Sequence, residues 1–276
     1  MKDYCDLHTH SSFSDGTCAP AELIRLAEEA GLGAVALCDH NTVAGLPDFL
    51  KAAEGSPVEA VPGIEFSTEY EGKELHILGL FVRPEHYNAV NDLLDEALQR
   101  KEESNLELIR RLGEAGISLD YDRIKAESSG TVNRAVIAAA MVRSGYCDSV
   151  KNAFRDWLAP EKGYFLPPKR LDAFAVIRFI KSIGAVAVLA HPFLNLEEAQ
   201  LREFLRKADC LDGMEVYYPL FDEAQTVLAE GIAEEFGLLK SGGSDFHGEN
   251  KPDIHLGSGK GELRVSIRCL EEMKCL

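Results

Sequence analysis

The most informative stretch of the sequence is Tyr4-Cys5-Asp6-Leu7-His8-Thr9-His10, followed by Ser14-Asp15-Gly16. The segment from Tyr4 to Leu7 predicts a short strand. His8 and His10 stand two residues apart, so both imidazoles point to the same face of an extended chain. The serine, aspartate and glycine that follow are typical of a turn. Such a turn can bring the Asp15 carboxylate back to the two histidines, where it would add an oxygen ligand to two nitrogen ligands.

The bulk composition is that of a globular enzyme. At 276 residues the chain is long enough to bury a large core in one or two domains. No apolar run could cross a bilayer and no secretory signal is present, so we expect a cytoplasmic protein without a membrane partner. The seven cysteines are scattered and form no Cys-x-x-Cys pair, which favours reduced thiols over a disulfide framework.

The formal net charge of −17 limits the classes of ligand. A strongly acidic protein is repelled by duplex nucleic acid, so we expect no duplex partner. A small phosphorylated ligand stays compatible with this charge, because bound divalent cations reverse the field inside a single pocket.

Amphipathic and apolar segments alternate along most of the chain and predict βα units. Residues 20–30 have the pattern of an amphipathic helix, and residues 34–38 form an apolar run typical of a strand buried on both faces. Further strands are expected over 58–61, 75–82, 185–190, 213–217 and 238–241. We expect these strands to be parallel, with polar side chains at their C-terminal ends. That arrangement predicts an α/β fold of the (β/α) barrel type, whose active site lies at those ends.

Residues 85–167 interrupt the βα pattern. Apolar residues recur at helical spacing over 87–116, and residues 132–145 and 149–158 predict two more helices. An interval of roughly eighty residues is far longer than the usual connection between strands. We therefore expect a barrel formed by residues 1–84 and 168–276. The helical insertion, residues 85–167, is expected to cover its active-site face.

Nine residues that can bind a metal ion lie at or near the ends of the expected strands. They are His8, His10, Asp15, His40, Glu65, His76, His191, Asp245 and His247. Glu65 comes just after the Pro62-Gly63 step, which we expect to end the third strand. Any one of these residues alone is more often a core or capping residue. Their occurrence together at or near the strand ends predicts a metal centre.

The chain resembles the polymerase-and-histidinol-phosphatase (PHP) family of metal-dependent phosphoesterases. The matching segments are Asp6-Leu7-His8-Thr9-His10, Ser14-Asp15-Gly16, Asp39-His40-Asn41-Thr42, Gly63-Ile64-Glu65, Glu74-Leu75-His76-Ile77-Leu78-Gly79, Ala190-His191-Pro192 and Gly243-Ser244-Asp245-Phe246-His247-Gly248. They span nearly the whole chain in the order that the family has. The resemblance implies a distorted seven-stranded (β/α)7 barrel that holds two or three divalent metal ions.

The resemblance also implies a ligand set for each ion. The first ion would be bound by His8, His10, Glu65 and Asp245, the second by Glu65, His76 and His191, and the third by Asp15, His40 and His247. Glu65 would bridge two ions. Mixed nitrogen and oxygen ligation suits manganese, iron or zinc without choosing among them. Some relatives, including histidinol phosphatases, have a histidine in place of Asp15, which leaves the metal preference of the third site open.

The insertion resembles the branch of the family that acts on nucleoside 3′,5′-bisphosphates and short oligoribonucleotides. The similarity runs from Gly130 through Arg134 to Gly145, and then includes Ala153-Phe154 and Tyr164-Phe165-Leu166-Pro167. In that branch the arginine at position 134 binds substrate phosphate. The alternative for Arg134 is a solvated arginine at the start of a helix. Two residues later the branch usually has a histidine where this chain has Val136, which leaves a second phosphate contact and the exact substrate open.

These features predict a phosphoesterase that acts on small nucleotides. Water activated by the metal ions would attack phosphorus, while the metals and Arg134 neutralise charge on the phosphate oxygens. Asp245 or His247 is a candidate acid for the leaving oxygen, and Asp39 is expected to orient a ligand imidazole. The expected partner is a small phosphorylated substrate or a short single-stranded RNA.

Three alternatives stay open at this point. A histidinol-phosphate phosphatase, or another small-molecule phosphatase, would use the same metal site. An amidohydrolase also begins with His-x-His after its first strand, although this chain has no obvious position for a carbamylated lysine. A non-catalytic PHP-like module that only binds metal is the third, but it would be expected to have lost some of the ligands.

Overall fold

The computed structural model describes residues 2–127 and 132–276, and the chain divides into two compact units. The first unit is formed by the chain up to Asp92 together with Leu171–Leu276, and the second unit is Leu93–Arg170. Gly130, part of the motif quoted above, lies outside the described residues.

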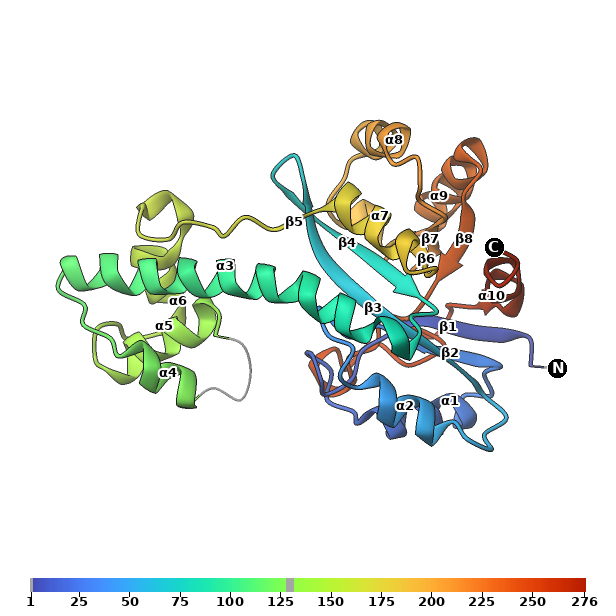
Figure 1. The fold of residues 1–276 in the computed structure, drawn as a ribbon, viewed down its shortest axis with the longest axis horizontal. Coiled ribbons are helices and arrows are strands. Elements are labelled where there is room, and N and C mark those ends of the chain that lie inside the picture. Colours follow the sequence, from blue (N-terminus) through green and yellow to red (C-terminus); the bar gives the residue numbers. More distant parts are fainter. Residues whose placement is uncertain (1, 128–131) are drawn as a thin grey trace. The chain divides into compact units, whose positions relative to one another are not determined.

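A mixed sheet lies at the centre of the first unit (Figure 1). Its longer strands are β1 (Tyr4–Thr9), β2 (Ala34–Leu37), β3 (Glu59–Tyr70), β4 (Lys73–Leu80), β6 (Val186–Leu189), β7 (Gly213–Tyr217) and β8 (Leu239–Gly242). Two short strands, β5 (Leu171–Asp172) and β9 (Val265–Ser266), complete it. The strand order is β8-β7-β6-β4-β3-β2-β1-β9, and β5 pairs with β3.

The chain that leaves β8 pairs with the end of β1 and nearly closes the sheet. The Asp245 N–H donates to the His8 carbonyl at 2.8 Å, and the His10 N–H donates to the Phe246 carbonyl at 2.9 Å. The same hydrogen bonds therefore close the barrel and bring the first ligand motif beside the last one. The expected fold class, a distorted α/β barrel with a helical insertion, is confirmed.

The expectation that all these strands are parallel is wrong for β4. This strand runs antiparallel to both β3 and β6. The reason is a two-residue turn, Glu71-Gly72, in which both residues have positive φ (50° and 77°), a conformation that joins adjacent antiparallel strands. β3 also continues through Pro62 and Gly63, so Glu65 lies inside the strand and not after its end.

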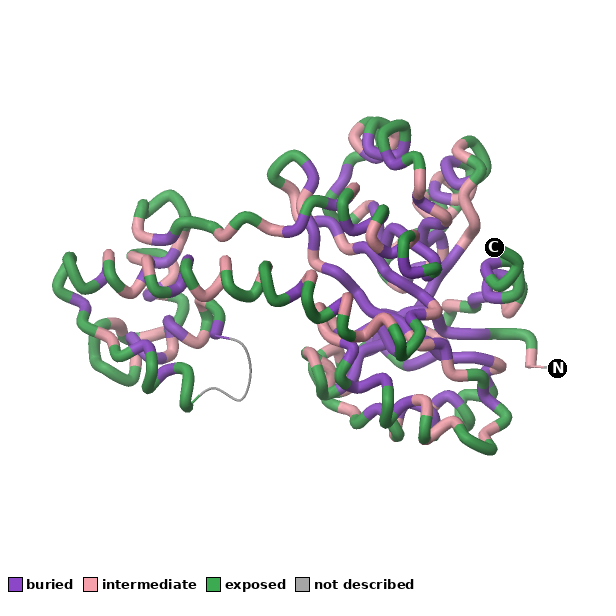
Figure 2. Tube along the Cα trace, in the orientation of Figure 1, coloured by how far each residue is buried: buried purple, intermediate pink, exposed green. Residues whose placement is uncertain are grey.

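Helices surround the sheet, and most of them pack against its strands. They are α1 (Pro20–Glu29), α2 (Leu46–Ala52), α7 (Ala173–Ser182), α8 (Glu198–Lys207), α9 (Glu223–Phe236) and α10 (Ile267–Met273). The helix α7, for example, buries an apolar stripe formed by Val176, Ile177 and Ile180. The carboxylate of its N-cap residue, Asp172, accepts a hydrogen bond from the Ala175 N–H at 2.8 Å. Figure 2 shows the strands as nearly continuous buried segments, as expected of strands covered on both sides. The sequence analysis did not anticipate α10.

The second unit is helical. Its elements are α3 (Tyr87–Glu114), which begins in the first unit, α4 (Tyr121–Glu127), α5 (Arg134–Arg143), α6 (Val150–Ala153) and a π-helical turn, Phe154–Leu158. They enclose a separate core that includes Leu108, Leu112, Ile137 and Met141. Short 3-10 turns occupy Pro84–His86, Pro160–Lys162, Pro192–Leu194 and Gly248–Asn250. In the described residues of both units, no helix combines the length and apolar character needed to cross a membrane.

The closure of the barrel depends on a glycine. A Cβ placed on Gly243 would lie 2.5 Å from the His8 backbone nitrogen, so β1 and the chain after β8 could not approach each other. We expect Gly243→Ala to destabilise the protein by about 2 kcal/mol or more, as overpacking does, measured by urea unfolding followed by circular dichroism.

Gly231→Ala is the matched control for this test. Gly231 lies in α9 of the same unit, with ordinary φ and no atom near its added Cβ. We expect it to stabilise the protein by about 0.5–1 kcal/mol, because a helical glycine loses more conformational freedom than alanine does. Wild-type stability for Gly243→Ala would show that the close approach is not needed.

Candidate metal centre

The structure brings all nine predicted ligand residues into one cluster within the first unit. Their positions follow from the strands: His8 in β1, His10 and Asp15 after β1, His40 after β2, Glu65 in β3, His76 in β4, His191 after β6, and Asp245 and His247 after β8. Although the residues come from distant parts of the sequence, pairing between neighbouring strands aligns them at one place.

Glu65 lies at the centre of the cluster and is fully buried. Its Oε2 lies 3.2 Å from Nε2 of His8 and 3.2 Å from Nε2 of His10. Its Oε1 lies 2.8 Å from Nδ1 of His76 and 3.1 Å from Nε2 of His191. The two carboxylate oxygens therefore face different sets of imidazoles, as a carboxylate that bridges two metal ions must.

Asp245 faces the same cluster from the chain after β8. Its Oδ1 lies 3.2 Å from Nε2 of His10 and 3.8 Å from Nε2 of His8. Its Oδ2 accepts hydrogen bonds from the Tyr218 hydroxyl at 2.8 Å and from Lys251 Nζ at 2.6 Å. One oxygen is thus held by the protein and the other is directed at the histidines.

Backbone strain accompanies this arrangement. Asp245 and His191 both have positive φ, at 53° and 27°. A side chain with a Cβ rarely adopts such values unless the surrounding structure imposes them, and residues of this kind gather at functional sites.

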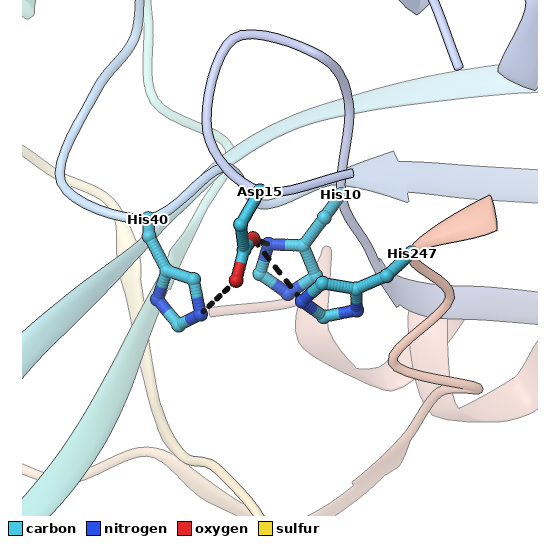
Figure 3. A group of neighbouring side chains, drawn as sticks. All are labelled: His10, Asp15, His40 and His247. Atoms are coloured by element: carbon cyan, nitrogen blue, oxygen red, sulfur yellow. Dashed lines mark ion pairs between the residues drawn. The ribbon is translucent and has the colours of Figure 1, made fainter. Parts of the chain in front are cut away.

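Asp15 forms a second group with the imidazoles of His10, His40 and His247, which we call the outer group (Figure 3). Its Oδ1 lies 3.1 Å from Nε2 of His247 and 3.8 Å from Nδ1 of His10, and its Oδ2 lies 3.8 Å from Nε2 of His40. Asp15 is the most exposed of the nine, with 55% of its side-chain surface accessible. His10 faces Glu65 through Nε2 and Asp15 through Nδ1. It therefore belongs both to the outer group and to the group with His8 and Asp245.

Several buried polar atoms of the cluster make no hydrogen bond. Among the described residues these include His8 Nε2, both ring nitrogens of His10, His40 Nδ1 and Glu65 Oε2. Buried polar atoms are normally satisfied, so a concentration of unsatisfied nitrogens and oxygens indicates a missing partner. Imidazole and carboxylate donors at this spacing fit divalent transition-metal ions.

The carboxylates and imidazoles shift one another's pKa values. Burial opposes ionisation of Glu65, but the charges of His8 and His40 hold its pKa well below the usual range. Burial likewise opposes protonation of His76, yet the Glu65 carboxylate raises its pKa to about 9. For His40 burial dominates and lowers the pKa to about 4. Without metal the cluster therefore keeps protons that a metal ion has to displace.

Metal binding should consequently release protons. His76 is protonated at neutral pH when its pKa is about 9, and a ring nitrogen cannot hold a proton and a metal ion together. We expect affinity for Mn²⁺ to rise between about pH 6 and pH 8, by about tenfold per pH unit for each proton released. Titration calorimetry in buffers of different protonation enthalpy measures the released protons. Replacement of His76 by glutamine should reduce the pH slope, and an affinity independent of pH would contradict the assignment.

Glu215 is a functional residue that the sequence analysis missed. It is fully buried in β7. Its Oε1 accepts a hydrogen bond from Nδ1 of His8 at 2.9 Å, and its Oε2 accepts one from the His191 N–H at 2.7 Å. The first bond leaves Nε2 of His8 facing Glu65, and the second supports the strained backbone of His191. A single acidic residue between the apolar Met214 and Val216 was the signal available in the sequence.

Among the residues that the structure describes, Asp39 forms no hydrogen bond with an imidazole, which differs from the role expected for it. Its carboxylate accepts hydrogen bonds from the Ser11 N–H at 2.7 Å, the Ser11 hydroxyl at 2.6 Å and the Ser14 hydroxyl at 2.6 Å. The side chain reaches the turn after β1 because β2 lies next to β1 in the sheet. Asp39 therefore positions the turn that carries Asp15.

Glu215→Gln should weaken metal binding without unfolding the protein. An amide cannot accept from both His8 and the His191 backbone as a carboxylate does, and loss of such a supporting partner typically costs 10–100-fold in metal affinity. Glu234→Gln is the control, since Glu234 is an exposed residue paired with Lys240. Mn²⁺ affinity by calorimetry, with circular dichroism for folding, measures the effect. Equal affinities for the two variants would remove Glu215 from the site.

Proteins of known family are similar to this chain over most of its length. The PHP domain model matches residues 6–165. The chain is 35% identical over 245 residues to a 5′-3′ exoribonuclease of Haemophilus influenzae, covering 88% of this chain and 89% of that protein. It is 31% identical over 258 residues to the phosphoribosyl 1,2-cyclic phosphate 1,2-diphosphodiesterase of Eggerthella lenta, covering 91% and 97%. It is 29% identical over 265 residues to the 3′,5′-nucleoside bisphosphate phosphatase of Chromobacterium violaceum, covering 90% of each.

A solved structure agrees with these relatives. The crystal structure of a Bifidobacterium adolescentis protein classed as a metal-dependent phosphoesterase superposes with a TM-score of 0.74 and 29% identity, over 98% of this chain and 95% of that one. Fold, ligand cluster and relatives together define a hydrolase of phosphate esters. The chain belongs to the PHP family.

Proposed function

We propose that this protein hydrolyses the phosphate esters of small nucleotides, with nucleoside 3′,5′-bisphosphates and short oligoribonucleotides as its substrates. The relatives from H. influenzae and C. violaceum, whose names specify RNA and nucleoside bisphosphates, support this substrate class. The observation that carries the proposal is the environment of Arg134 in the second unit.

Arg134 is the first residue of α5 and is partly buried. Its guanidinium lies over the Phe165 ring, 4.2 Å from the centroid, and 5.7 Å from the Phe154 centroid. Nη1 donates to the Leu158 carbonyl at 3.3 Å. In the part of the chain that the structure describes, no carboxylate pairs with this guanidinium, which leaves most of its five N–H donors for an anion. These contacts favour a held guanidinium over the solvated arginine considered from sequence.

Burial lowers the pKa of Arg134, and the charge of Arg170 lowers it further. An arginine stacked on an aromatic ring presents planar donors whose geometry suits phosphate.

Val136 cannot take part in this contact. Its side chain is apolar and packs against the core of the second unit, so it offers no hydrogen bond to a phosphate. We propose that Arg134 provides the phosphate contact without it.

We propose that the cluster holds two or three divalent ions, manganese, iron or zinc, in the ligand sets that the resemblance implies, with Glu65 as the bridge. Such ions supply charge neutralisation at phosphate and an activated water.

The seven cysteines are free thiols, which supports a cytoplasmic location.

The contacts of the cluster bear on the two candidate acids, Asp245 and His247. Burial opposes ionisation of Asp245, but His10 and His8 hold its pKa well below the usual range, and its Oδ2 already accepts two hydrogen bonds. Asp245 is therefore unsuited to donate a proton to the leaving oxygen. His247 donates from Nδ1 to the Asp245 carbonyl at 2.8 Å, and its Nε2 faces Asp15. We assign Asp245 and His247 to metal binding.

The test is hydrolysis by the manganese-loaded protein, measured as phosphate released from the small substrates and as nucleotides released from the RNA. Adenosine 3′,5′-bisphosphate and a short RNA are compared with AMP, histidinol phosphate and phosphoribosyl 1,2-cyclic phosphate. We expect preference for the bisphosphate or the RNA, and a loss of at least tenfold in kcat/KM for Arg134→Ala, about 1.4 kcal/mol. Arg143→Ala on the same helix is the control, because Arg143 is exposed and pairs with Glu127.

Other outcomes identify the alternatives. Turnover of histidinol phosphate alone would assign the protein as a small-molecule phosphatase. If no substrate is hydrolysed while metal is bound, the chain is a metal-binding module without catalysis. Equal effects of Arg134→Ala and Arg143→Ala would remove Arg134 from the substrate site.

A further inference from the structure

A cavity of about 270 Å³ lies beside the metal cluster, entirely within the first unit. Most of its wall is apolar and comes from the segments after β7 and β8, including Tyr218, Leu220 and Ile254. Asp245 also lines it, together with Lys251. An apolar cavity with a few polar groups at one side is the usual form of a small-molecule site.

Asp245 connects the cavity to the cluster. Tyr218 and Lys251, both in the cavity wall, donate to Oδ2 of Asp245 at 2.8 Å and 2.6 Å, while Oδ1 lies 3.2 Å from Nε2 of His10. A single carboxylate therefore separates the cavity from the imidazoles. The cavity is therefore the immediate neighbour of any ligand that the cluster binds.

The wall is suited to a planar, apolar group. The Tyr218 ring lies 5.4 Å from the His191 ring and 5.2 Å from the Phe221 ring, measured between centroids, so it is held rigidly. Leu220, in the same wall, has 49% of its surface exposed, which is large for an apolar side chain. An aromatic heterocycle in the cavity would cover the apolar surface of Leu220, while Tyr218, which is only 4% exposed, forms a fixed part of the wall.

The charge at the rim suits a nucleotide better than a neutral aromatic compound. Lys260 and Lys251 line the cavity together with one acidic residue outside the cluster, Asp253. Lys251 pairs with Asp245. Lys260 has no carboxylate partner among the residues that the structure describes. Its ammonium group is thus available to an anion on a ligand in the cavity.

We propose that this cavity binds the nucleoside part of the substrate, with the base against Tyr218 and Leu220 and the scissile phosphate toward the metal cluster. This inference rests on the proposed nucleotide substrates and adds to them a site for the base. It predicts that the enzyme distinguishes a nucleotide from the corresponding sugar phosphate.

The experiment uses Leu220→Ala with Leu194→Ala as the matched control. Both leucines are exposed to nearly the same extent, 49% and 46%, so neither change threatens folding, but only Leu220 lines the cavity. Kinetics are measured on the manganese-loaded full chain with adenosine 3′,5′-bisphosphate and with its analogue that has hydrogen in place of the base. Calorimetry on the same preparations compares the Kd of AMP with that of ribose 5-phosphate.

We expect Leu220→Ala to raise KM for the bisphosphate by about tenfold through lost apolar burial, with kcat unchanged. The base-free analogue should be cleaved as by the wild type, and the Kd of AMP should rise while that of ribose 5-phosphate stays constant. Leu194→Ala should alter neither.

Two results would overturn the inference, and they can be told apart. If wild-type protein cleaves the bisphosphate and its base-free analogue with equal kcat/KM, or the two leucine variants behave alike, the cavity does not bind the base although the proposed function stands. If wild-type protein cleaves neither but releases phosphate from histidinol phosphate, the proposed function fails and the base site fails with it.

Discussion

The structure depends on one buried carboxylate among imidazoles. Glu65 has no exposed surface, yet it contacts His8, His10, His40, His76 and His191. An isolated charge in such a place is very costly to bury, and only partners of opposite charge or metal ions offset the cost. Because the five histidines come from four strands and their loops, those strands have to pair with or near β3 before Glu65 can be satisfied. Asp245, which faces His8 and His10, comes from the segment that pairs with the end of β1, so the cluster is complete only when the sheet has nearly closed.

Three further buried carboxylates hold the segments that carry the ligands. Asp6 accepts from the Ser244 N–H and hydroxyl and from the Gly257 N–H, and so fixes the chain after β8. Asp39 fixes the turn that carries Asp15, and Glu215 fixes the His8 ring and the His191 backbone. Loops carry most of the ligands, and loops are mobile unless hydrogen bonds hold them. These carboxylates therefore keep the cluster at the spacing that metal ions require.

The errors of the sequence analysis have a common cause. The direction of a strand follows from its pairing with neighbouring strands. Residues 75–82 therefore do not indicate by themselves whether their strand is parallel or antiparallel, although the turn before it, Glu71-Gly72, is short. Pro62-Gly63 was expected to end a strand, yet proline is tolerated there and β3 continues. Glu215 was missed because an acidic residue inside a strand is conspicuous only once its burial is known. Asp39 lies beside His40 in sequence, but its hydrogen-bond partners in space belong to the turn after β1.

The amino-acid sequence by itself determined the alternation of strands and helices, the helical insertion, and the identity of the nine candidate ligands. These follow from local periodicity and from residue chemistry, both of which act over a few positions. Only the tertiary structure decided the direction of β4, the closure of the barrel through the chain after β8, the partners of Asp39 and Glu215, and the cavity beside Asp245. Each of these depends on contacts between segments far apart in sequence, such as the 207 positions between His8 and Glu215. Contacts of that kind are selected by packing and burial of the whole chain, and no short stretch encodes them.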